Sequence, residues 1–501
     1  MMIGGVPFES TACRCVHSFN LGVRRYVIDG NAMTAFPADR APAGLTAQIE
    51  SAARCDASTC QCLRPLANET VSSSLTAIRS VADKTPNGLV AIRPLSGGIP
   101  NGLIELGLRP AGGSEIPDDD QLRTLTLMVN QTCNLACTYC YADGGEYGSP
   151  GQMTAATAKR AVDWLIERSG PVRNLVLTFF GGEPLISFGL IKDVVAYANR
   201  QGDFSGKVFS FSTTTNGTLL SDEIIAFLKE HQFEVMVSLD GSKGVNDDQR
   251  PFKNGKGSYD TIVPKLRKLL AEMPETPARA TITGAAPPDE IRQALHEIGF
   301  RKTGLGMASG TLFESMAHEP RSVRSQGVVA LLAQDTEDLL ETIRQRDAER
   351  LKTLDSAILG QLAQFLAGNK SKHPCGAGRR LVAVSAQGDV SLCHRFVGTD
   401  DYTLGTIFED NVTLPALNVS PVEHLQPCST CFAKYLCGGA CYHDNVTTNG
   451  SLYEPAPDLC NMMRRTMELV AYLSCELTSE DRAFLASVTG VGGRECWHDY
   501  F

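Results

Sequence analysis

Between residues 122 and 307 the sequence alternates short apolar runs with longer stretches of helical periodicity. The apolar runs lie near 123–129, 174–180, 207–213, 234–239, 278–283 and 303–307. The helical stretches lie near 154–168, 187–200, 221–230, 257–271 and 287–298. Such alternation is typical of repeated strand-helix units that form a parallel sheet. The sequence therefore predicts an α/β fold with about six units, followed by a helical region near 328–367.

Three cysteines follow the first apolar run directly. Cys133, Cys137 and Cys140 are spaced C-x3-C-x2-C in the stretch CNLACTYC. Iron-sulfur clusters usually take four cysteine thiolates, so three close ones predict a cubane cluster with one iron open to another ligand. In the alternative interpretation, the three thiols at i, i+4 and i+7 lie on a buried helix face. Polar neighbours such as Asn130 and Thr132 favour a turn at a strand end instead.

With this motif the sequence resembles the radical S-adenosylmethionine (SAM) superfamily. The resemblance implies that the amino-acid end of SAM chelates the open iron of a [4Fe-4S] cluster. It also implies that one electron from the cluster cleaves SAM to a 5'-deoxyadenosyl radical. The fold to expect is a partial (β/α)6 radical SAM barrel, whose chemistry gathers at the C-terminal ends of the strands.

Three later apolar runs end in segments that suit a cofactor. These are Gly-Gly-Glu-Pro at 181–184, Thr-Asn-Gly at 215–217 and Ser-Leu-Asp-Gly at 238–241. Glycines let the backbone approach a ligand closely, and a carboxylate can pair with an ammonium group. The resemblance implies that the first segment contacts the amino group of SAM and that the later ones contact its ribose and carboxylate. The SAM-binding residues expected on this basis are Tyr139, which would pack near adenine, Gly181, Gly182, Glu183, Thr215, Asn216, Ser238, Arg250 and Arg279.

A second cysteine array occupies the last third of the chain. It resembles the SPASM domain, which binds two auxiliary [4Fe-4S] clusters in maturases of peptides and proteins, although its last spacing is one residue longer than the commonest form. The ligands implied for the first auxiliary cluster are Cys375, Cys393 and Cys441, and those for the second are Cys428, Cys431, Cys437 and Cys460. Three clusters are therefore expected in all. A pair of zinc ribbons is the alternative, because zinc also takes thiolates.

The first auxiliary cluster lacks a fourth cysteine. Sulfatase-maturing relatives have one a few residues upstream of the array, but no cysteine lies between 141 and 374. One iron is therefore expected to be open, or ligated by His373 or by a substrate group such as a thiolate. Sulfatase maturases also have an Asp after the second cysteine of the array, whereas Cys393 is followed by His394 and Arg395. This difference argues against formylglycine formation.

Three short segments resemble one particular family of maturases within this superfamily. TFFGGE at 178–183, HPCGAG at 373–378 and CHRFV at 393–397 look like the maturases of quinohemoprotein amine dehydrogenase. Those enzymes join a cysteine sulfur to a methylene carbon of Asp or Glu in a small subunit, which gives intrapeptide thioether cross-links. The resemblance implies the same reaction here, with His394 and Arg395 as candidate catalytic residues. The alternatives are a formylglycine-generating maturase, a carbon-carbon cross-linking cyclase and a non-catalytic iron-sulfur module that binds a peptide.

Composition and charge limit the partners and the compartment. With 46 Lys and Arg against 56 Asp and Glu, the net charge of -10 predicts no general attraction to nucleic acid or to an anionic membrane. No long apolar run and no signal peptide are found, so we expect a cytoplasmic protein. In that setting the 17 cysteines point to metal ligation rather than to disulfides. The expected partners are a ribosomally made polypeptide substrate and an electron donor such as flavodoxin or ferredoxin.

A chain of 501 residues exceeds one ordinary core, so several domains are expected. Strands at Val23–Asp29 and Thr34–Asp39 and a helix at Leu45–Ala53 resemble a small winged-helix module that holds a substrate leader segment. The expected divisions are an N-terminal module at 1–81, a Pro- and Gly-rich linker at 82–120, the barrel at 121–370, the SPASM domain at 371–475 and a tail at 476–501. A zinc or redox site is the alternative to plain surface or half-buried thiols for Cys13, Cys15, Cys55, Cys60 and Cys62, although they lack a regular paired spacing.

Overall fold

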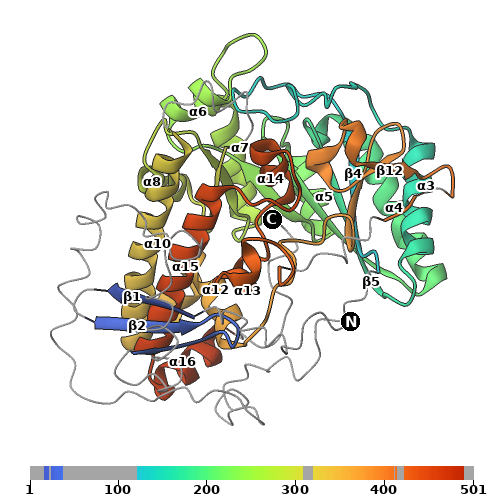
Figure 1. The fold of residues 1–501 in the computed structure, drawn as a ribbon. Coiled ribbons are helices and arrows are strands. Elements are labelled where there is room, and N and C mark those ends of the chain that lie inside the picture. The colour runs from blue at the N-terminus through green and yellow to red at the C-terminus, as the bar shows by residue number, and fades with distance from the viewer. Residues whose placement is uncertain are drawn as a thin grey trace, which may run out of the picture.

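The computed structural model describes residues 16–21, 24–37, 121–308, 320–410, 412–414 and 422–489 (Figure 1). The five N-terminal cysteines, the helix expected at 45–53 and the linker expected at 82–120 lie outside these residues. Among the helices that the structure describes, none combines the length and the apolar character needed to cross a membrane.

A parallel sheet forms the centre of the molecule, as the alternating pattern predicted. Its strands are β4 (Thr124–Asn130), β5 (Asn174–Gly181), β6 (Val208–Thr215), β7 (Glu234–Ser238), β8 (Ala278–Ile282) and β9 (Thr303–Met307). Each strand pairs in parallel with the next one along the chain. The six predicted strands and the α/β class are therefore confirmed.

Helices connect these strands and cover one face of the sheet (Figure 1). They are α3 (Ala155–Arg168), α4 (Phe188–Ser205), α5 (Asp222–Glu230), α6 (Lys243–Gln249), α7 (Tyr259–Glu272) and α8 (Pro288–Ile298), with a short 3-10 helix η4 (Pro184–Ser187) before α4. Two of them begin at side-chain caps, because Thr154 and Ser221 accept hydrogen bonds from the first turns of α3 and α5. On α8 the buried residues Ile291, Leu295 and Ile298 recur at helical spacing and face the core.

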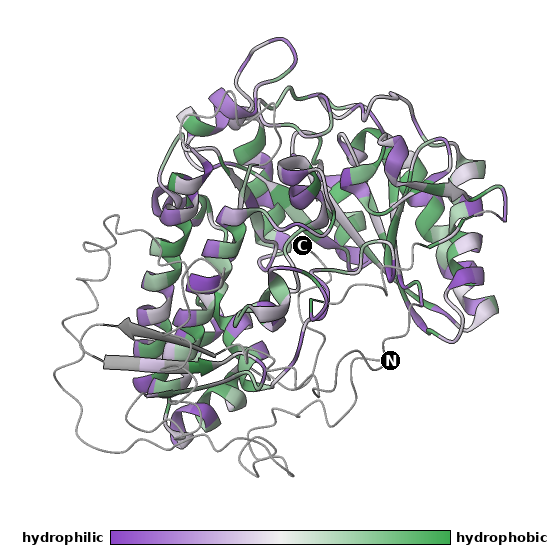
Figure 2. Ribbon diagram, in the orientation of Figure 1, coloured by the Kyte–Doolittle hydropathy of each residue, from purple (hydrophilic) through white to green (hydrophobic). Residues whose placement is uncertain are grey.

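The two faces of the sheet differ in polarity. On β5, Leu175, Leu177 and Phe179 are buried against the helices, as strand alternation requires. The alternate positions are only half-buried and include Thr178, whose hydroxyl lies 2.8 Å from that of Ser212 on β6. Figure 2 shows this mixture of apolar and polar residues along the strands. This face of β5 therefore carries both apolar and polar side chains.

The sheet continues beyond the predicted barrel. Strand β10 (Leu381–Val384) pairs in parallel with β4, and β11 (Asp389–Ser391) and β12 (Thr403–Thr406) follow as antiparallel strands. The full order is β12-β11-β10-β4-β5-β6-β7-β8-β9. The boundary expected at residue 370 therefore does not separate two sheets, because the first part of the cysteine-rich region extends the barrel sheet.

A second core joins the two ends of the chain. Helices α10 (Arg321–Arg344), α11 (Ala348–Thr353) and α12 (Ala357–Leu366) pack with α15 (Pro457–Glu476) and α16 (Ser479–Thr489). Strands β1 (Val16–Leu21), β2 (Arg24–Asp29) and β3 (Thr34–Pro37) form an antiparallel sheet beside α10 and α15 (Figure 1). Tyr26 and Ile28 of β2 are buried in this core. The two N-terminal strands expected from the sequence are present, and β1 is an additional one.

Candidate metal and cofactor site

The three-cysteine loop follows β4 and is not helical. Its backbone is held by the segment after α6, because Ala136 N donates to Pro251 O at 2.8 Å and Thr138 N donates to Gln249 O at 2.9 Å. Cys133, Cys137 and Cys140 are all partly exposed. The interpretation as a buried helix face is therefore wrong, and the loop presents three thiols from one turn-rich segment.

Gly181 and Gly182 bring the end of β5 against this loop. Gly182 N donates to Asn130 O at 2.8 Å, and Glu183 N donates to Thr132 O at 3.0 Å. A Cβ atom would lie 2.0 Å from Asn130 O at Gly181 and 2.2 Å from Thr132 O at Gly182, so no other residue fits without a shift. The sequence argument expected these glycines to admit a ligand. In the structure they admit the backbone that leads to Cys133.

Glu183 is fully buried and fixes the next strand end. Its Oε1 accepts from the Thr215 hydroxyl at 2.8 Å and from Leu185 N at 3.0 Å, and its Oε2 accepts from Asn216 N at 2.7 Å. Burial raises the pKa of Glu183, while these three donors lower it. The carboxylate thereby ties the end of β5 to the end of β6.

The Asn216 side chain extends this hydrogen-bond network to Cys133. Its Nδ2 donates to Asn134 Oδ1 at 2.9 Å and lies 3.8 Å from Cys133 Sγ. Its Oδ1 accepts from the Thr218 hydroxyl at 2.6 Å, and Asn134 Nδ2 donates to Thr218 Oγ1 at 2.8 Å. Asn134 and Thr218 were not among the predicted site residues. Their signal in the sequence is their position beside Cys133 and beside the Thr-Asn-Gly segment.

A second polar group lies on the other side of the cysteine loop. The Tyr139 hydroxyl donates to Asp240 Oδ2 at 2.6 Å and accepts from the Arg250 guanidinium, which lies 3.9 Å from the Asp240 carboxylate. Burial raises the pKa of Asp240, and Arg250 opposes this rise. Asp240 was missed as a functional residue, although it belongs to the Ser-Leu-Asp-Gly segment. Tyr139 and Arg250, both predicted to bind SAM, are brought together here.

Ser238 and Arg279 face each other across two strands. They are register partners on β7 and β8. The Arg279 guanidinium lies over the glycines of β9, since a Cβ atom at Gly306 would be 2.1 Å from its Nη2 and one at Gly304 would be 3.4 Å from its Nη1. Burial, followed by the charge of Arg395, lowers the pKa of Arg279 to about 10. Arg279 therefore lies within electrostatic reach of the cysteine-rich region.

The cysteines predicted for the first auxiliary cluster come from three separate segments. Cys393 follows β11 and precedes the 3-10 helix η5 (His394–Phe396), while Cys441 precedes α14 (Tyr442–Asn449). Cys375 and Cys393 pack against one small apolar cluster that includes Tyr442. Burial, with Cys441 as the next cause, raises the pKa of Cys393 to about 12. The fold thus gathers the three thiols, and bound iron would favour their deprotonated form.

Aromatic and cationic side chains connect the two three-cysteine sites. Tyr141 directly follows Cys140, and the guanidinium of Arg395 lies 5.1 Å from the centre of its ring. Arg395 Nη1 is 3.1 Å from Asp444 Oδ1 and 3.6 Å from Cys441 Sγ. Tyr141 and Asp444 were not predicted. Their neighbours Cys140 and Cys441 are the only sequence signal for them.

His394, the other predicted catalytic residue, lies beside the same aromatic and cationic side chains. Its ring centre lies 4.5 Å from that of Phe180 at the end of β5 and 6.4 Å from that of Tyr141. Burial, followed by the charge of Arg395, lowers the pKa of His394 to about 3. Of the two predicted catalytic residues, only Arg395 therefore carries charge near neutral pH.

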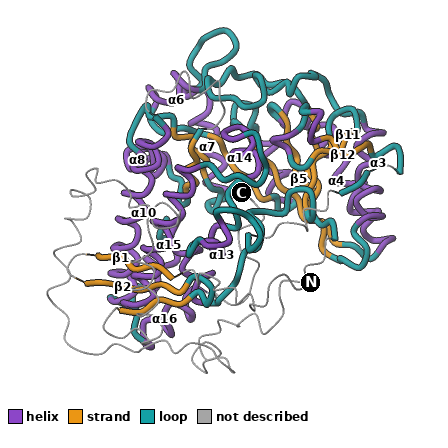
Figure 3. The backbone as a smooth tube through the Cα atoms, in the orientation of Figure 1, coloured by secondary structure: helices purple, strands orange, loops and turns teal. Residues whose placement is uncertain are grey.

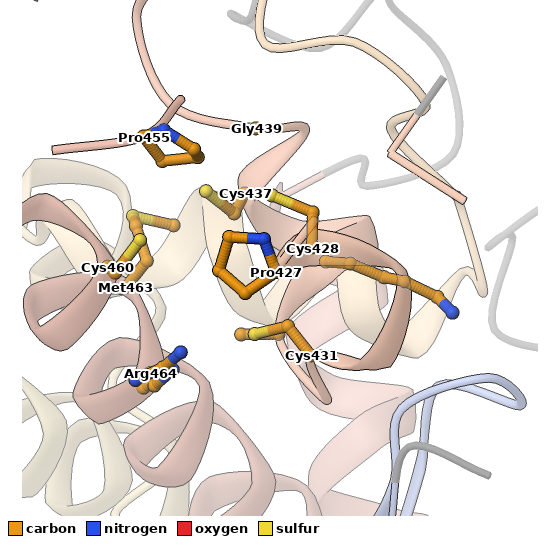
Figure 4. Close-up of a pocket in the computed structure, with 11 residues that line it drawn as sticks. Pro427, Cys428, Cys431, Cys437, Gly439, Pro455, Cys460, Met463 and Arg464 are labelled. Carbon is orange, nitrogen blue, oxygen red and sulfur yellow. The ribbon is translucent and has the colours of Figure 1, made fainter. Parts of the chain in front are cut away.

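Four cysteines line a cavity between the 3-10 helix η8 (Cys428–Thr430), α13 (Lys434–Cys437) and the start of α15. They are the four predicted for the second auxiliary cluster, Cys428, Cys431, Cys437 and Cys460, and Figure 4 shows their side chains around it. Four thiolates on one zinc ion would lie within about 4 Å of each other, because Zn–S bonds are about 2.3 Å long. In the described part of the chain, no three His, Cys, Asp or Glu residues converge on a point that could hold one metal ion.

Comparison with known proteins agrees with this geometry. Residues 127–299 match the radical SAM superfamily. The cysteine-type anaerobic sulfatase-maturating enzyme of Clostridium novyi is 24% identical over 340 residues, which cover 64% of this chain and 88% of that enzyme. The uncharacterized protein MJ0907 of Methanocaldococcus jannaschii is 38% identical over 144 residues, and this match covers 28% of this chain and 47% of that protein.

The fold is similar to that of a solved structure with bound AdoMet. Native anSMEcpe with bound AdoMet aligns with a TM-score of 0.58 at 18% identity, and the alignment covers 70% of this chain and 99% of that one. At this identity the similarity concerns the fold alone.

Proposed function

We propose that this chain, a radical SAM enzyme, acts on a bound polypeptide and joins a cysteine sulfur to a carbon of a neighbouring acidic residue. When bound, SAM and the clusters would supply the radical that takes a hydrogen from the substrate carbon and accept the remaining electron. The C–H hydrogen leaves with that radical, the S–H proton goes to solvent, and one C–S bond forms, so the product is a thioether two hydrogens lighter than the substrate.

The observation that carries this proposal is the charge between the two three-cysteine sites. Arg279 and Arg395 lie close enough for the charge of one to lower the pKa of the other, and Asp444 is the carboxylate that pairs with Arg395. These two guanidinium groups lie in a partly buried space. They would suit the carboxylate of a substrate Asp or Glu, because guanidinium groups bind carboxylates well.

The polar networks serve to position the reacting groups. Glu183 and Asn216 hold the strand ends against Cys133, while Arg250 and Asp240 hold Tyr139 from the other side. Rigid donors of this kind keep reactants aligned, which is the main contribution that a protein makes to cofactor-borne radical chemistry. Cys133, Cys137 and Cys140 would hold the radical cluster, and the two auxiliary sets would hold two more.

Formylglycine formation is the alternative that the relatives favour. The Clostridium novyi enzyme is named as a sulfatase-maturating enzyme and aligns over most of its length. In this chain, however, His394 follows Cys393, where sulfatase maturases place their proton-accepting Asp, and the nearby Asp444 is paired with Arg395. A carbon-carbon cross-link remains the third reaction to test.

Product analysis separates these reactions. The reconstituted protein would be incubated anaerobically with SAM, a reductant or flavodoxin, and a small polypeptide that contains both Cys and acidic residues. We expect a loss of about two mass units per link, protection of the linked cysteine from alkylation and no hydrazide adduct, since a thioether has neither a free thiol nor a carbonyl group. Changing the acceptor cysteine of the substrate to Ala should abolish the link while 5'-deoxyadenosine still forms. An aldehyde at that cysteine would replace this proposal with formylglycine formation.

A further inference from the structure

His443 has a buried ring nitrogen without a hydrogen-bond partner. The residue follows Cys441 by two positions in α14 and is 9% exposed. Its Nδ1 is shielded from solvent, and among the described residues no donor or acceptor lies within hydrogen-bond distance of it. Most buried polar groups in folded proteins have such a partner, and burying one without it is unfavourable. This nitrogen therefore suits a polar group that a bound molecule supplies.

Aromatic rings from two cysteine-bearing segments hold the imidazole in place. The ring centre of Tyr141, which follows Cys140, lies 5.8 Å from that of His443 at an interplanar angle of 67°. The ring centre of Phe396, in the segment that follows Cys393, lies 5.3 Å away at an angle of 64°. Both are edge-to-face contacts, a favoured geometry for aromatic pairs. The imidazole therefore lies between the loop of the radical site and a segment of the first auxiliary site.

The charged groups beside His443 belong to the space in which the substrate carboxylate was placed above. Asp444 is the next residue of α14, and its Oδ1 lies 3.1 Å from Arg395 Nη1. The Arg395 guanidinium lies 5.1 Å from the centre of the Tyr141 ring, so His443 and Arg395 both contact that ring. Under the proposed function, Arg395 and Arg279 bind the acidic side chain of the substrate. His443 therefore borders the position that this side chain would take.

We infer that His443 binds the main chain of the polypeptide substrate through a hydrogen bond at Nδ1. This inference rests on the proposed function and deepens it. In the proposed reaction the acidic side chain lies at the guanidinium groups and the cysteine sulfur lies at the first auxiliary site. The part of the substrate that passes His443 is then the backbone that joins these two residues.

A peptide group suits this contact for a chemical reason. It carries an N–H donor and a C=O acceptor, so it can pair with Nδ1 in either tautomer of the imidazole. Every residue of a polypeptide offers such a group, so the contact does not depend on the side chains of the substrate. It makes His443 a positioning residue, which sets the two substrate residues that face the two cysteine sites.

Binding of an unreactive polypeptide tests this contact. The probe is the polypeptide that the parent protein modifies, with its acceptor cysteine changed to Ala and a fluorescent label at one end. Fluorescence anisotropy with the reconstituted protein gives its Kd. We expect His443→Phe to weaken binding roughly tenfold, because it keeps an aromatic ring but loses the nitrogen. His231→Phe is the matched control, since that ring lies against Phe227 after α5, and it should bind the probe like the parent.

Two further variants show whether Nδ1 itself makes the contact. The amide of Asn places a polar atom near the position of Nδ1, whereas the longer side chain of Gln places it near the position of Nε2. We therefore expect His443→Asn to retain most of the affinity and His443→Gln to bind the probe as weakly as His443→Phe. This pair also decides the question if His443→Phe fails to fold or to retain its iron. Equal affinity of the Asn and Gln variants would contradict a contact at Nδ1.

An ester scan of the probe identifies the group that His443 contacts. Each peptide bond near the Ala position is replaced in turn by an ester, which removes the N–H donor and weakens the carbonyl acceptor. We expect one ester to weaken binding to the parent roughly 5- to 10-fold without weakening binding to His443→Phe, because both changes remove the same hydrogen bond. If a side-chain substitution in the probe shows this behaviour and no ester does, the partner is a side chain and the inference is wrong.

The contrary results separate this inference from the proposed function. If His443→Phe retains the iron of the parent and binds the probe equally tightly, the inference is wrong and the proposed reaction stands. If labelling with 15N-histidine reveals a nitrogen bound directly to a cluster, and His443→Phe abolishes that coupling, His443 is a metal ligand and the inference is again wrong. If the parent converts the polypeptide to an aldehyde, the proposed reaction fails, while the binding of the probe still decides the role of His443.

Discussion

The two three-cysteine sites hold their thiols in opposite ways. Cys133, Cys137 and Cys140 lie on one loop within eight residues, and hydrogen bonds from three strand ends hold that loop. Cys375, Cys393 and Cys441 span 67 positions of the chain and belong to segments with few regular elements, which appear mostly as loops in Figure 3. The first site is therefore built by local sequence on a rigid sheet, whereas the second depends on distant segments meeting.

This difference predicts how each site responds to the loss of iron. A loop fixed by a barrel keeps its shape without metal, because its backbone groups are already satisfied. A site made of separate segments gains much of its order from the metal, since the binding free energy becomes folding free energy.

The largest effect should come from deleting the local site. Replacing Cys133, Cys137 and Cys140 together by Ala should abolish SAM cleavage and lower the iron content from about twelve to about eight atoms per chain. Iron analysis and 5'-deoxyadenosine release measure the two effects. Cys475→Ala is the matched control, because this buried thiol of α15 belongs to neither array, and it should retain all the iron. About four irons in the intact anaerobic protein would rule out the auxiliary clusters.

Removal of iron from the whole protein should first expose the segment that carries Cys441 of the second site together with three cysteines of the second auxiliary set. After chelation we expect early proteolysis around residues 422–456, where only short helices such as α13 (Lys434–Cys437) connect the cysteines. Strand β10 should resist, since it is paired with β4 within the sheet. Limited proteolysis followed by mass spectrometry locates the cuts. Equal resistance to proteolysis with and without iron would mean that the two sites do not differ in their dependence on metal.

Glu183→Gln tests whether the local site depends on its network. The amide retains the size of the side chain but loses the charge, and its NH2 group must oppose one of the donors at Leu185, Thr215 or Asn216. We expect SAM cleavage to fall by roughly 10- to 100-fold and the free energy of unfolding to fall by about 1–3 kcal/mol. The exposed Glu167→Gln is the control, since its surface ion pair with Arg160 contributes little. Unchanged cleavage would mean that the loop does not need Glu183.

The smallest effect should come from displacing one cationic side chain, that of Arg279. Gly306→Ala would place its Cβ atom 2.1 Å from Arg279 Nη2 and push the guanidinium aside, while Gly304→Ala leaves 3.4 Å to Nη1. We expect product formation with a polypeptide substrate to fall roughly tenfold in the first variant, because a displaced positioning group misaligns the substrate. SAM cleavage without the polypeptide should stay near that of the parent in both variants. If Gly306→Ala lowers both activities equally, Arg279 serves SAM rather than the substrate.

The sequence was informative wherever chemistry and local pattern coincide. Alternating apolar runs located the six parallel strands. The four cysteines that the SPASM resemblance groups for the second auxiliary cluster line one cavity. It could not show that β10 pairs with β4, because a four-residue apolar run carries no signal for a partner more than 250 residues away. It also missed Asp240, Tyr141 and Asp444, whose roles depend on what the fold places beside them. Glu183 and the glycines before it were identified as important, but their contacts with the cysteine loop follow from tertiary packing alone.

The pairing of β10 with β4 fixes a distance within the molecule. The loop with Cys133 begins at the C-terminal end of β4, whereas β11 runs back antiparallel to β10, so Cys393 follows this hairpin toward the opposite end of the same sheet. The distance between the place where hydrogen would leave the substrate and the place where its sulfur would be held is therefore built into one sheet and does not depend on a hinge. Under the proposed reaction, the spacing of the two reacting side chains in space would select the substrate, whereas the loops between them would be free to vary in sequence and length.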